Sequence, residues 1–439
     1  FIGGGQSNTA SGGYFSSVVG GNSNTASGYG AFVGGGSSST ASGYRSVVSG
    51  GSNNIASGSC STVSGGQANC ATSTWSTVGG GCTNIASGTR GFVGGGQSNT
   101  ASNNFSAIAG GQGNTASGVY SVTTGGYFNT ASGTYSFLGS GSINGVAGAC
   151  AALVGGKANA ASGNISFVGG GCSNTASGAN SSIVGGCNNT SSGIASSILG
   201  GRGNSVSTAC NSISGGYGNI ITASTGRSAI VSGSSNSVAG SGLAFIGGGN
   251  TNTISGSYYG TIAGGVGNTT SAWANFIGAG QSNSVSGGCA AVLGGLSNTA
   301  SGGGSSVGGG RGNTASNTYS TVGGGQENIA SGIRSTIGGG LSNAATGNCS
   351  TVGGGNGNTA NLNWSTISGG VGNTTCSSYG AISGGYYNCT GFVSAVGGGD
   401  GNKAMGSYAA IAGGYCNCAS GNCSFIGGGG SIGAGGNVA

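Results

Sequence analysis

The chain has 439 residues and contains no Pro, no His and only two carboxylates, Glu327 and Asp400. Without His, it has no Ser–His or Cys–His nucleophile pair and no imidazole metal ligand. Two isolated carboxylates supply neither the acid pair of a glycosidase nor the cage of a calcium site. We therefore expect no enzymatic activity, no metal site and no cofactor.

Charge is also scarce, because the only cations are eight Lys and Arg residues spread singly along the chain. A nucleic-acid surface needs clustered cations, so we expect no nucleic-acid partner. No run of 18 apolar residues occurs, so no membrane-spanning helix is expected. The chain starts at Phe1 without Met and in the middle of a repeat, so we expect a piece of a longer polypeptide.

Gly is abundant, with 112 residues, and it is arranged in a repeat. From Asn8 onward, an Asn occupies 27 of 28 anchor positions, with Ser39 as the exception, and 22 of the 27 spacings are 15 residues. With Asn as position 1, the consensus is N-T-A-S-G-x-x-S-T-V-G-G-G-x-x, of which residues 313–325 are a typical copy. Such self-similarity is the signature of stacked repeats. We expect one continuous array over residues 1–439.

Fifteen residues suit one coil of a β-solenoid, and two segments of each repeat, N-T-A-S-G and S-T-V-G-G, are typical of short strands. The pattern predicts an all-β parallel β-solenoid, a β-roll or β-helix, of about 28 coils. Alternation points positions 1, 3, 5, 8, 10 and 12 inward and positions 2, 4 and 9 outward. Gly at positions 12 and 13 is expected to adopt positive φ where the chain turns. Pro is absent because every coil must donate to the parallel ladder.

These orientations predict an inward Asn ladder at position 1 and an aliphatic core at position 10. The ladder is expected at Asn54, Asn69, Asn84, Asn99, Asn114, Asn313, Asn328 and Asn343. The core is expected at Val63, Val78, Ile108, Ile183, Val322 and Ile337. Irregular spacings between Asn219 and Asn268 predict loop insertions, and the 14-residue step from Asn388 to Asn402 predicts a deletion.

Fourteen Cys residues in a chain without His indicate an oxidising, extracellular setting. Cys172 and Cys187 both occupy position 14, one coil apart, so their Cα atoms should lie about 5 Å apart, within disulfide range. We predict a disulfide between them. The group Cys416, Cys418 and Cys423 matches no zinc-ligand spacing, and these residues are expected to be staples or free thiols.

Position 7, at a corner of the coil, collects aromatic rings. They include Trp75, Phe105, Tyr120, Tyr135, Tyr319, Trp364 and Tyr379. One interpretation is contact with a sugar, a receptor or a neighbouring filament through aromatic anchors. The other is that the rings cover gaps beside small residues. Both interpretations stay open.

Thr at position 2 and Ser at position 4 form outward T-x-S rows, and regular Thr arrays on flat solenoids resemble ice-binding faces. Thr holds position 2 in 14 of the 28 copies, and residues such as Ile55, Gly145 and Lys403 interrupt the row. Ice binding is therefore the least favoured of the functions considered.

The phrase at residues 86–102, ASGTRGFVGGGQSNTAS, resembles the head repeats of trimeric autotransporter adhesins, and similar Gly-rich repeats are found in bacterial surface and viral fibre proteins. The resemblance implies a parallel β-roll, an assembly of three chains and a binding surface displayed away from the cell. In that family, large aliphatic residues on the second strand meet in the trimer. Here positions 9 and 11 hold mostly Thr, Ser, Ala or Gly. The number of associated chains therefore stays open.

Our leading hypothesis is a structural subunit of an extracellular fibre or filament, located on a cell appendage or a virion fibre. The expected partner is the chain itself, in a filament, a bundle or a homo-oligomer such as the trimer that the resemblance implies. The alternative is an adhesin head that binds a host, matrix or glycan ligand. Ice binding is the third hypothesis.

Overall fold

The computed structural model describes residues 1–223, 226–240, 242–256 and 258–435. It confirms the expected fold, because the described chain is all-β and forms a parallel β-solenoid of about 28 coils with a spacing of about 15 residues. The chain forms two compact units, Phe1–Gly218 and Asn219–Ala439, and each has the same coil.

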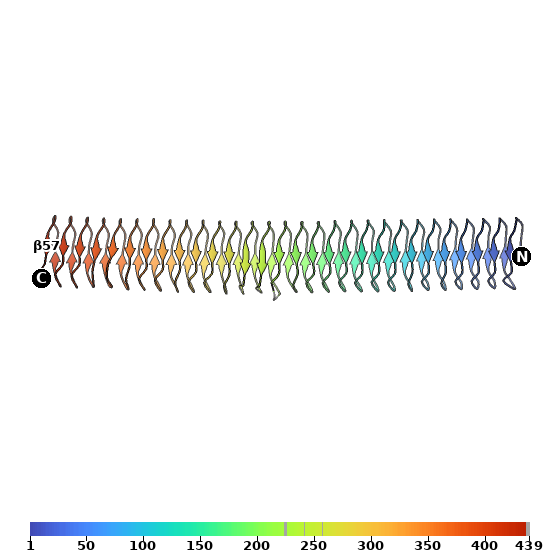
Figure 1. Cartoon of the computed structure of the whole chain (residues 1–439), viewed down its shortest axis with the longest axis horizontal. Helices are drawn as coiled ribbons and strands as arrows, with labels where there is room; N and C mark the ends of the chain where they lie inside the picture. Colours follow the sequence, from blue (N-terminus) through green and yellow to red (C-terminus); the bar gives the residue numbers. More distant parts are fainter. Residues whose placement is uncertain (224–225, 241, 257, 436–439) are drawn as a thin grey trace. The chain divides into compact units, whose positions relative to one another are not determined.

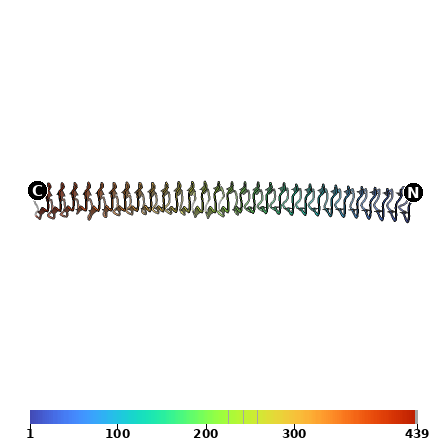
Figure 2. The same cartoon turned by 90° about the horizontal axis from the view of Figure 1, so that it is seen from above.

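Each coil contributes one strand to each of two sheets. Odd-numbered strands hold repeat positions 2 and 3, and even-numbered strands hold positions 9 and 10. Within each unit, the two strands of a coil point in opposite directions (Figure 1) and lie along opposite sides of the coil (Figure 2). A strand pairs in parallel with its counterpart one coil away, so that equivalent residues stand beside one another, as Ala315 does beside Ala330.

In the first unit, fourteen coils supply two sets of two-residue strands. The odd-numbered set is β1 (Thr9–Ala10), β3 (Thr25–Ala26), β5 (Thr40–Ala41), β7 (Ile55–Ala56), β9 (Cys70–Ala71), β11 (Ile85–Ala86), β13 (Thr100–Ala101), β15 (Thr115–Ala116), β17 (Thr130–Ala131), β19 (Gly145–Val146), β21 (Ala160–Ala161), β23 (Thr175–Ala176), β25 (Thr190–Ser191) and β27 (Ser205–Val206). The even-numbered set is β2 (Ser17–Val18), β4 (Phe32–Val33), β6 (Val47–Val48), β8 (Thr62–Val63), β10 (Thr77–Val78), β12 (Phe92–Val93), β14 (Ala107–Ile108), β16 (Val122–Thr123), β18 (Phe137–Leu138), β20 (Ala152–Leu153), β22 (Phe167–Val168), β24 (Ser182–Ile183), β26 (Ser197–Ile198) and β28 (Ser212–Ile213).

The second unit repeats this arrangement, with three-residue strands at β31 and β33. Its odd-numbered set is β29 (Ile220–Ile221), β31 (Ser237–Ala239), β33 (Thr253–Ser255), β35 (Thr269–Thr270), β37 (Ser284–Val285), β39 (Thr299–Ala300), β41 (Thr314–Ala315), β43 (Ile329–Ala330), β45 (Ala344–Ala345), β47 (Thr359–Ala360), β49 (Thr374–Thr375), β51 (Cys389–Thr390), β53 (Lys403–Ala404), β55 (Cys418–Ala419) and β57 (Gly433–Ala434). Its even-numbered set is β30 (Ala229–Ile230), β32 (Phe245–Ile246), β34 (Thr261–Ile262), β36 (Phe276–Ile277), β38 (Ala291–Val292), β40 (Ser306–Val307), β42 (Thr321–Val322), β44 (Thr336–Ile337), β46 (Thr351–Val352), β48 (Thr366–Ile367), β50 (Ala381–Ile382), β52 (Ala395–Val396), β54 (Ala410–Ile411) and β56 (Phe425–Ile426).

A third line of parallel pairing runs along position 14, which the repeat pattern does not reveal. Single residues bridge there from coil to coil, as in the series Gln67, Cys82 and Gln97. The residue types at position 14 vary widely, so no apolar alternation marks this line in the sequence. Each coil therefore has three paired segments joined by short corners.

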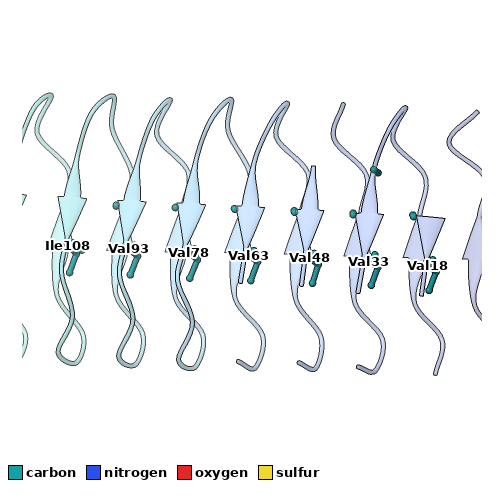
Figure 3. Close-up of a cluster of buried hydrophobic side chains, with 14 of the residues drawn as sticks. Val18, Val33, Val48, Val63, Val78, Val93 and Ile108 are labelled. Atoms are coloured by element: carbon teal, nitrogen blue, oxygen red, sulfur yellow. The ribbon is translucent and has the colours of Figure 1, made fainter. Parts of the chain in front are cut away.

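The core of each unit is a narrow column of small and aliphatic side chains. Val63, Val78, Ile108, Ile183, Val322 and Ile337 are all fully buried. Figure 3 shows position 10 of successive coils, from Val18 to Ile108, as one row of stacked side chains. Ala at position 3 lies opposite this row and is buried as well, as at Ala71 and Ala86. The interior therefore accepts about one branched aliphatic and one methyl group per coil.

The Asn at position 1 lies inside the coil and bonds to the backbone on three sides. Asn84 shows the pattern: its Oδ1 accepts from the backbone N–H of Asn99, at 3.0 Å. Its Nδ2 donates to the carbonyl oxygens of Gly80 and Gly96, each at 2.9 Å. The same pattern of buried bonds occurs at Asn54, Asn69, Asn99, Asn114, Asn313, Asn328 and Asn343.

Ser39 is the one anchor that is not Asn, and its side chain makes fewer hydrogen bonds than the Asn side chains do. Its hydroxyl accepts from the backbone N–H of Asn54 at 3.3 Å and donates to the Ser37 carbonyl at 3.4 Å. A hydroxyl carries one proton, whereas an amide nitrogen carries two. Ser at position 1 therefore cannot bond to both corner carbonyls at once.

The corners adopt left-handed backbone at positions 7, 13 and 15, which confirms the expectation for position 13 and corrects that for position 12. In the typical copy, φ is +56° at Tyr319, +88° at Gly325 and +56° at Glu327. Position 12 has no positive φ in most coils and is half-buried, not inward. Positions 7 and 15 escape notice in the sequence because residues other than Gly often fill them, at a cost of about 1–2 kcal/mol each.

Position 13 is Gly before every one of the 28 anchors, for two reasons. Its φ is left-handed, and a methyl group there would collide with the neighbouring coil. A Cβ on Gly325 would overlap the Gly340 carbonyl oxygen and lie 2.7 Å from Asn328 Nδ2. Gly at this corner thus lets the coils approach closely enough for the Asn side chain to bridge them.

The short coil after Asn388 confirms the predicted deletion. Thr375 pairs with Thr390, and Ala381 pairs with Ala395, so one residue fewer joins β51 to β52 than joins β49 to β50. Of the predicted insertions between Asn219 and Asn268, residues 224–225, 241 and 257 lie outside the described residues. The Asn ladder continues through this stretch, because Asn236 donates its backbone N–H to Asn219 Oδ1 at 3.0 Å.

We predict that Gly325→Ala destabilises the array strongly, by about 3 kcal/mol or more, because it combines left-handed strain with a backbone collision. Gly324→Ala is the matched control, since a Cβ there meets nothing within 4 Å. Urea unfolding followed by circular dichroism measures both. Equal midpoints for the two variants would contradict this account of the corner.

We predict that Asn328→Ala costs about 2–4 kcal/mol, because it leaves the carbonyls of Gly324 and Gly340 and the N–H of Asn343 without their side-chain partner. Asn328→Ser, which copies Ser39, should cost less. Amide hydrogen exchange detects the effect locally, because coils in a repeat array contact only their neighbours. The amides of residues 324–343 should exchange faster in the order wild type, Ser, Ala, and unchanged exchange there would refute the role assigned to the ladder.

Candidate functional site

The left-handed corner at position 7 projects its side chains outward in one row per unit. We call Trp75, Arg90, Phe105, Tyr120 and Tyr135 the ring row, because they occupy this corner in five consecutive coils. Trp75, Tyr120 and Tyr135 are each more than 40% exposed. The row owes its regularity to the 15-residue spacing, which places the same corner of successive coils side by side.

Members of the ring row stack on one another. The Phe105 and Tyr120 centroids lie 4.5 Å apart with an interplanar angle of 8°, and those of Tyr120 and Tyr135 lie 4.9 Å apart at 5°. The Arg90 guanidinium carbon lies 4.9 Å from the Trp75 ring centroid and 5.1 Å from that of Phe105. A cation between two rings is favourable because each ring face is negative. The row is thus a continuous stack of four rings and one guanidinium.

This stacking limits what the ring row can bind. A sugar that stacks on an aromatic side chain needs a free ring face. The faces between successive members of the row are already in contact with one another. A partner therefore meets ring edges, the Tyr hydroxyls and the outer faces at the two ends. These surfaces suit packing against another surface better than they suit enclosing a small ligand.

The second unit has a broken version of this row. The rings of Trp364 and Tyr379 stack at 5.1 Å and 5°. Tyr379 meets Phe392 edge to face at 6.1 Å, and Phe392 meets Tyr408 at 6.3 Å. Tyr319 stands apart from them, and its ring lies against Gly304 in the preceding coil. The position of Tyr319 over Gly304 fits the interpretation that these rings cover small residues, whereas contact of the rings with a partner stays a prediction.

A third aromatic group, near the start of the chain, was missed in the sequence. The rings of Tyr29 and Tyr44 stack at 5.6 Å and 7°, and the Arg45 guanidinium lies 5.1 Å from the Tyr44 centroid. Phe15 packs edge-on against Tyr29 at 6.1 Å. These tyrosines occupy position 6, which is one residue before the column in which aromatic rings were expected. Tyr in the same column of two successive copies was the available signal.

The outer face of the even-numbered sheet carries an apolar stripe that sequence analysis also missed. Its members are at position 9 or 11 in six successive coils, and each is at least 36% exposed: Val122, Phe137, Val154, Phe167, Val184 and Leu199. Their strands, β16 to β26, pair in unbroken register. We call this set the apolar stripe.

In five of the six coils of the stripe, positions 9 and 11 compensate for each other in volume. A large residue at one position accompanies a small one at the other, as Phe137 accompanies Gly139 and Leu199 accompanies Ser197. The Phe167 ring lies over Gly169, and a Cβ added to this glycine would lie 3.5 Å from the ring. Counting each position separately hides this pattern. In the second unit, by contrast, the coils from β40 to β48 present mainly Thr, Ser and Gly at these positions.

The T-x-S rows lie on the outer face of the odd-numbered sheet, with position 2 partly exposed in most coils. Thr100, Thr115 and Thr130 stand in register over β13, β15 and β17. Gly145 and Ile85 end this run on either side. Only three consecutive coils present Thr at position 2 here. The regular array of Thr side chains that would have to match the spacing of an ice lattice is therefore short.

The predicted disulfide between Cys172 and Cys187 is confirmed. The two residues bridge one another in the third pairing line, with their Cα atoms 4.7 Å apart. The other twelve cysteines are free thiols, and Cys60, Cys150, Cys210, Cys289, Cys349 and Cys423 lie in the position-7 row. Among the described residues no group of His, Cys, Asp or Glu is arranged to hold a metal ion.

Two of the free thiols touch. Cys376 Sγ and Cys389 Sγ are 2.7 Å apart. Burial is the main factor that raises the pKa of the Cys389 thiol to about 12, with the hydrogen bond and charge of Cys376 adding to it and the Lys403 ammonium opposing it. Burial alone raises the pKa of Cys70. The repeat pattern does not predict the Cys376–Cys389 contact, because the two residues occupy different repeat positions.

An acidic corner lies nearby in the third pairing line, where Asp400 bridges Tyr386 on one side and Tyr415 on the other. A hydrogen bond with Tyr387 is the main factor that raises the pKa of Tyr386. A hydrogen bond with Cys416 does the same for the pKa of Tyr415, and the Asp400 charge contributes at both phenols. All of these groups lie at the surface of the solenoid, and they line no enclosed cavity.

The described part of the chain encloses no pocket, and no helix in it is long and apolar enough to cross a membrane. Comparison with protein-family models and with curated protein sequences finds no match to the chain. The distinctive features of its surface are the ring row, the apolar stripe, the Thr rows and the exposed thiols.

We predict that Arg90→Ala destabilises the coils of the ring row by about 1–2 kcal/mol, because it removes two cation–π contacts at once. Arg334→Ala is the matched control, since Arg334 occupies the same corner and, in the described structure, has no cation–π contact. Hydrogen exchange of the amides in residues 75–105 and 319–349 compares the two. Equal effects at both sites would show that the stack does not stabilise the array.

Proposed function

We propose that this protein is a structural subunit of an extracellular fibre or surface filament, in which the solenoid associates with further copies of itself. The apolar stripe is the observation that carries the proposal. Six successive coils expose one large apolar side chain each, on a face with almost no charge. Contiguous exposed apolar surface of this kind is typical of protein–protein contact.

The pitch of the stripe favours a second copy of the chain as the partner. Adjacent coils are 4.7 Å apart at Cys172 and Cys187, so the stripe presents a side chain at every strand spacing. Another solenoid with the same pitch meets all six coils in register. The alternation of large and small residues between positions 9 and 11 also gives the face projections and hollows. The projections of one copy can fit into the hollows of the other. The association of three chains implied by the adhesin resemblance is one form of such self-association.

The Cys172–Cys187 disulfide supports placing the protein outside the cell or on a surface. Disulfides persist in oxidising compartments and are reduced in most cytosols. The extreme scarcity of charge fits a surface that is covered by neighbouring chains in a fibre, since isolated soluble proteins usually rely on surface charge for solubility.

An adhesin head is the alternative proposal, and the exposed edges and hydroxyls of the ring row favour it. Tyr120 and Tyr135 offer phenol groups to a partner surface, and Arg90 adds a cation. Such a row suits a flat protein or matrix surface, because its inner ring faces are in mutual contact.

We predict that the full chain self-associates and that the triple variant Phe137→Thr, Phe167→Thr and Leu199→Ser weakens this association at least about 100-fold. Thr and Ser occupy the same positions in other coils, so the solenoid should remain folded. Sedimentation velocity over a concentration series measures the association, and negative-stain microscopy of the same samples shows the particles.

Thr321→Ser, Thr336→Ser and Thr351→Ser form the matched control, because these substitutions fall at position 9 outside the stripe. This control should associate like the wild type. A wild-type chain that stays single at every concentration would refute the fibre proposal. Saturable binding of such a single chain to a matrix protein or glycan would favour the adhesin alternative.

A further inference from the structure

The contact between Cys376 and Cys389 lies at the border of the short coil. Cys376 follows β49 at position 4, and Cys389 begins β51 at position 2 of the next coil. In regular coils a side chain at position 4 stands beside position 4 of its neighbour. In the coil after Asn388 the residue that follows β51 is Gly391, so Cys376 has no side chain beside it at that place.

The two thiols lie on the outer face of the same sheet at a spacing close to that of a covalent bond. Their sulfur atoms are 2.7 Å apart, which is shorter than the ordinary contact of two unbonded sulfurs. Cys376 is exposed, whereas Cys389 is half-buried and stands in register with Thr374 and Lys403. Among the described residues, no other pair of free thiols is in contact. The geometry therefore singles out one pair among twelve free cysteines.

We propose that Cys376 and Cys389 are a second disulfide site, which is oxidised by thiol–disulfide exchange with a low-molecular-weight disulfide such as oxidised glutathione. The bond joins two adjacent coils at the one place where the array lacks a residue. It is thus a redox-dependent staple of the irregular coil, and it is separate from the Cys172–Cys187 bond of the first unit.

The exchange proceeds in two balanced steps. The exposed Cys376, as thiolate, attacks one sulfur of the small disulfide, forms a mixed disulfide and releases one small thiolate. Cys389 then loses its proton to solvent and attacks Cys376 Sγ, which releases the second small thiolate. The two cysteines together lose two electrons, and the small disulfide gains them. Cys376 attacks first because it is accessible, and because the raised pKa of Cys389 keeps that thiol protonated.

The test uses the full chain, first reduced and then exposed to oxidised glutathione at low protein concentration. After acid quenching, alkylation and denaturation, chymotrypsin cleaves after Trp364, Tyr379, Tyr387 and Phe392. This places Cys376 in the peptide 365–379 and Cys389 in the peptide 388–392. We expect mass spectrometry to find these two peptides joined. Recovery of both peptides separately, with Cys172 and Cys187 bonded in the same sample, would overturn the proposal.

Thiol counting on denatured protein gives an independent readout. Cys376→Ser restores the consensus residue and should show one more free thiol than oxidised wild type, because Cys389 loses its partner. Cys349→Ser is the control and should show one fewer, since Cys349 is free in either case. Cys389→Thr should match Cys376→Ser. If Cys376→Ser instead showed one fewer free thiol than wild type, as the control does, the two cysteines would not be bonded and the proposal would fail.

Discussion

The hydrogen bonds of the buried Asn at position 1 are the interaction on which this structure depends. Parallel pairing satisfies the backbone along the three paired lines, but at the Gly-rich corner it gives the position-13 carbonyl, as at Gly96, one donor and the position-12 carbonyl, as at Gly80, none. One amide side chain supplies two donors to these carbonyls and one acceptor to the next coil, as Asn84 does. No other side chain of this size offers two donor protons and an acceptor oxygen without charge. The Gly at position 13 is the complement of this Asn, because only a bare Cα lets the adjacent corner approach.

A coil built in this way has a narrow interior that side chains fill. It holds an Asn, an Ala, a Ser and a branched aliphatic side chain, and these recur from coil to coil. Most variation in size and charge therefore falls at outward positions and corners, where position 7 holds residues as different as Trp75, Arg90 and Cys60. Because the coils stack in register, each outward position becomes a row along the unit. A substitution at one coil accordingly changes only one member of a row.

The sequence predicts the features that a strict period makes visible. The Asn ladder and the position-10 core, from Val63 to Ile337, follow directly from the alternation of inward and outward residues. The Cys172–Cys187 bond follows from one shared column. The left-handed corners at Tyr319 and Glu327 do not follow, because the usual sign of such backbone is Gly, and Gly is mostly absent from these columns. The apolar stripe depends on a correlation between two columns, and the contact of Cys376 with Cys389 joins two different columns of adjacent coils. A consensus averages out both.

Pairing only with adjacent coils also makes the number of coils adjustable. Each coil presents to the next the same pattern of backbone groups that it receives from the previous one, so adding or removing fifteen residues leaves every remaining bond possible. A gene that encodes such an array can therefore gain or lose whole repeats by recombination between its copies without disturbing the fold. The length of the protein is then open to selection almost independently of its stability, while the rows of outward residues are rewritten one rung at a time.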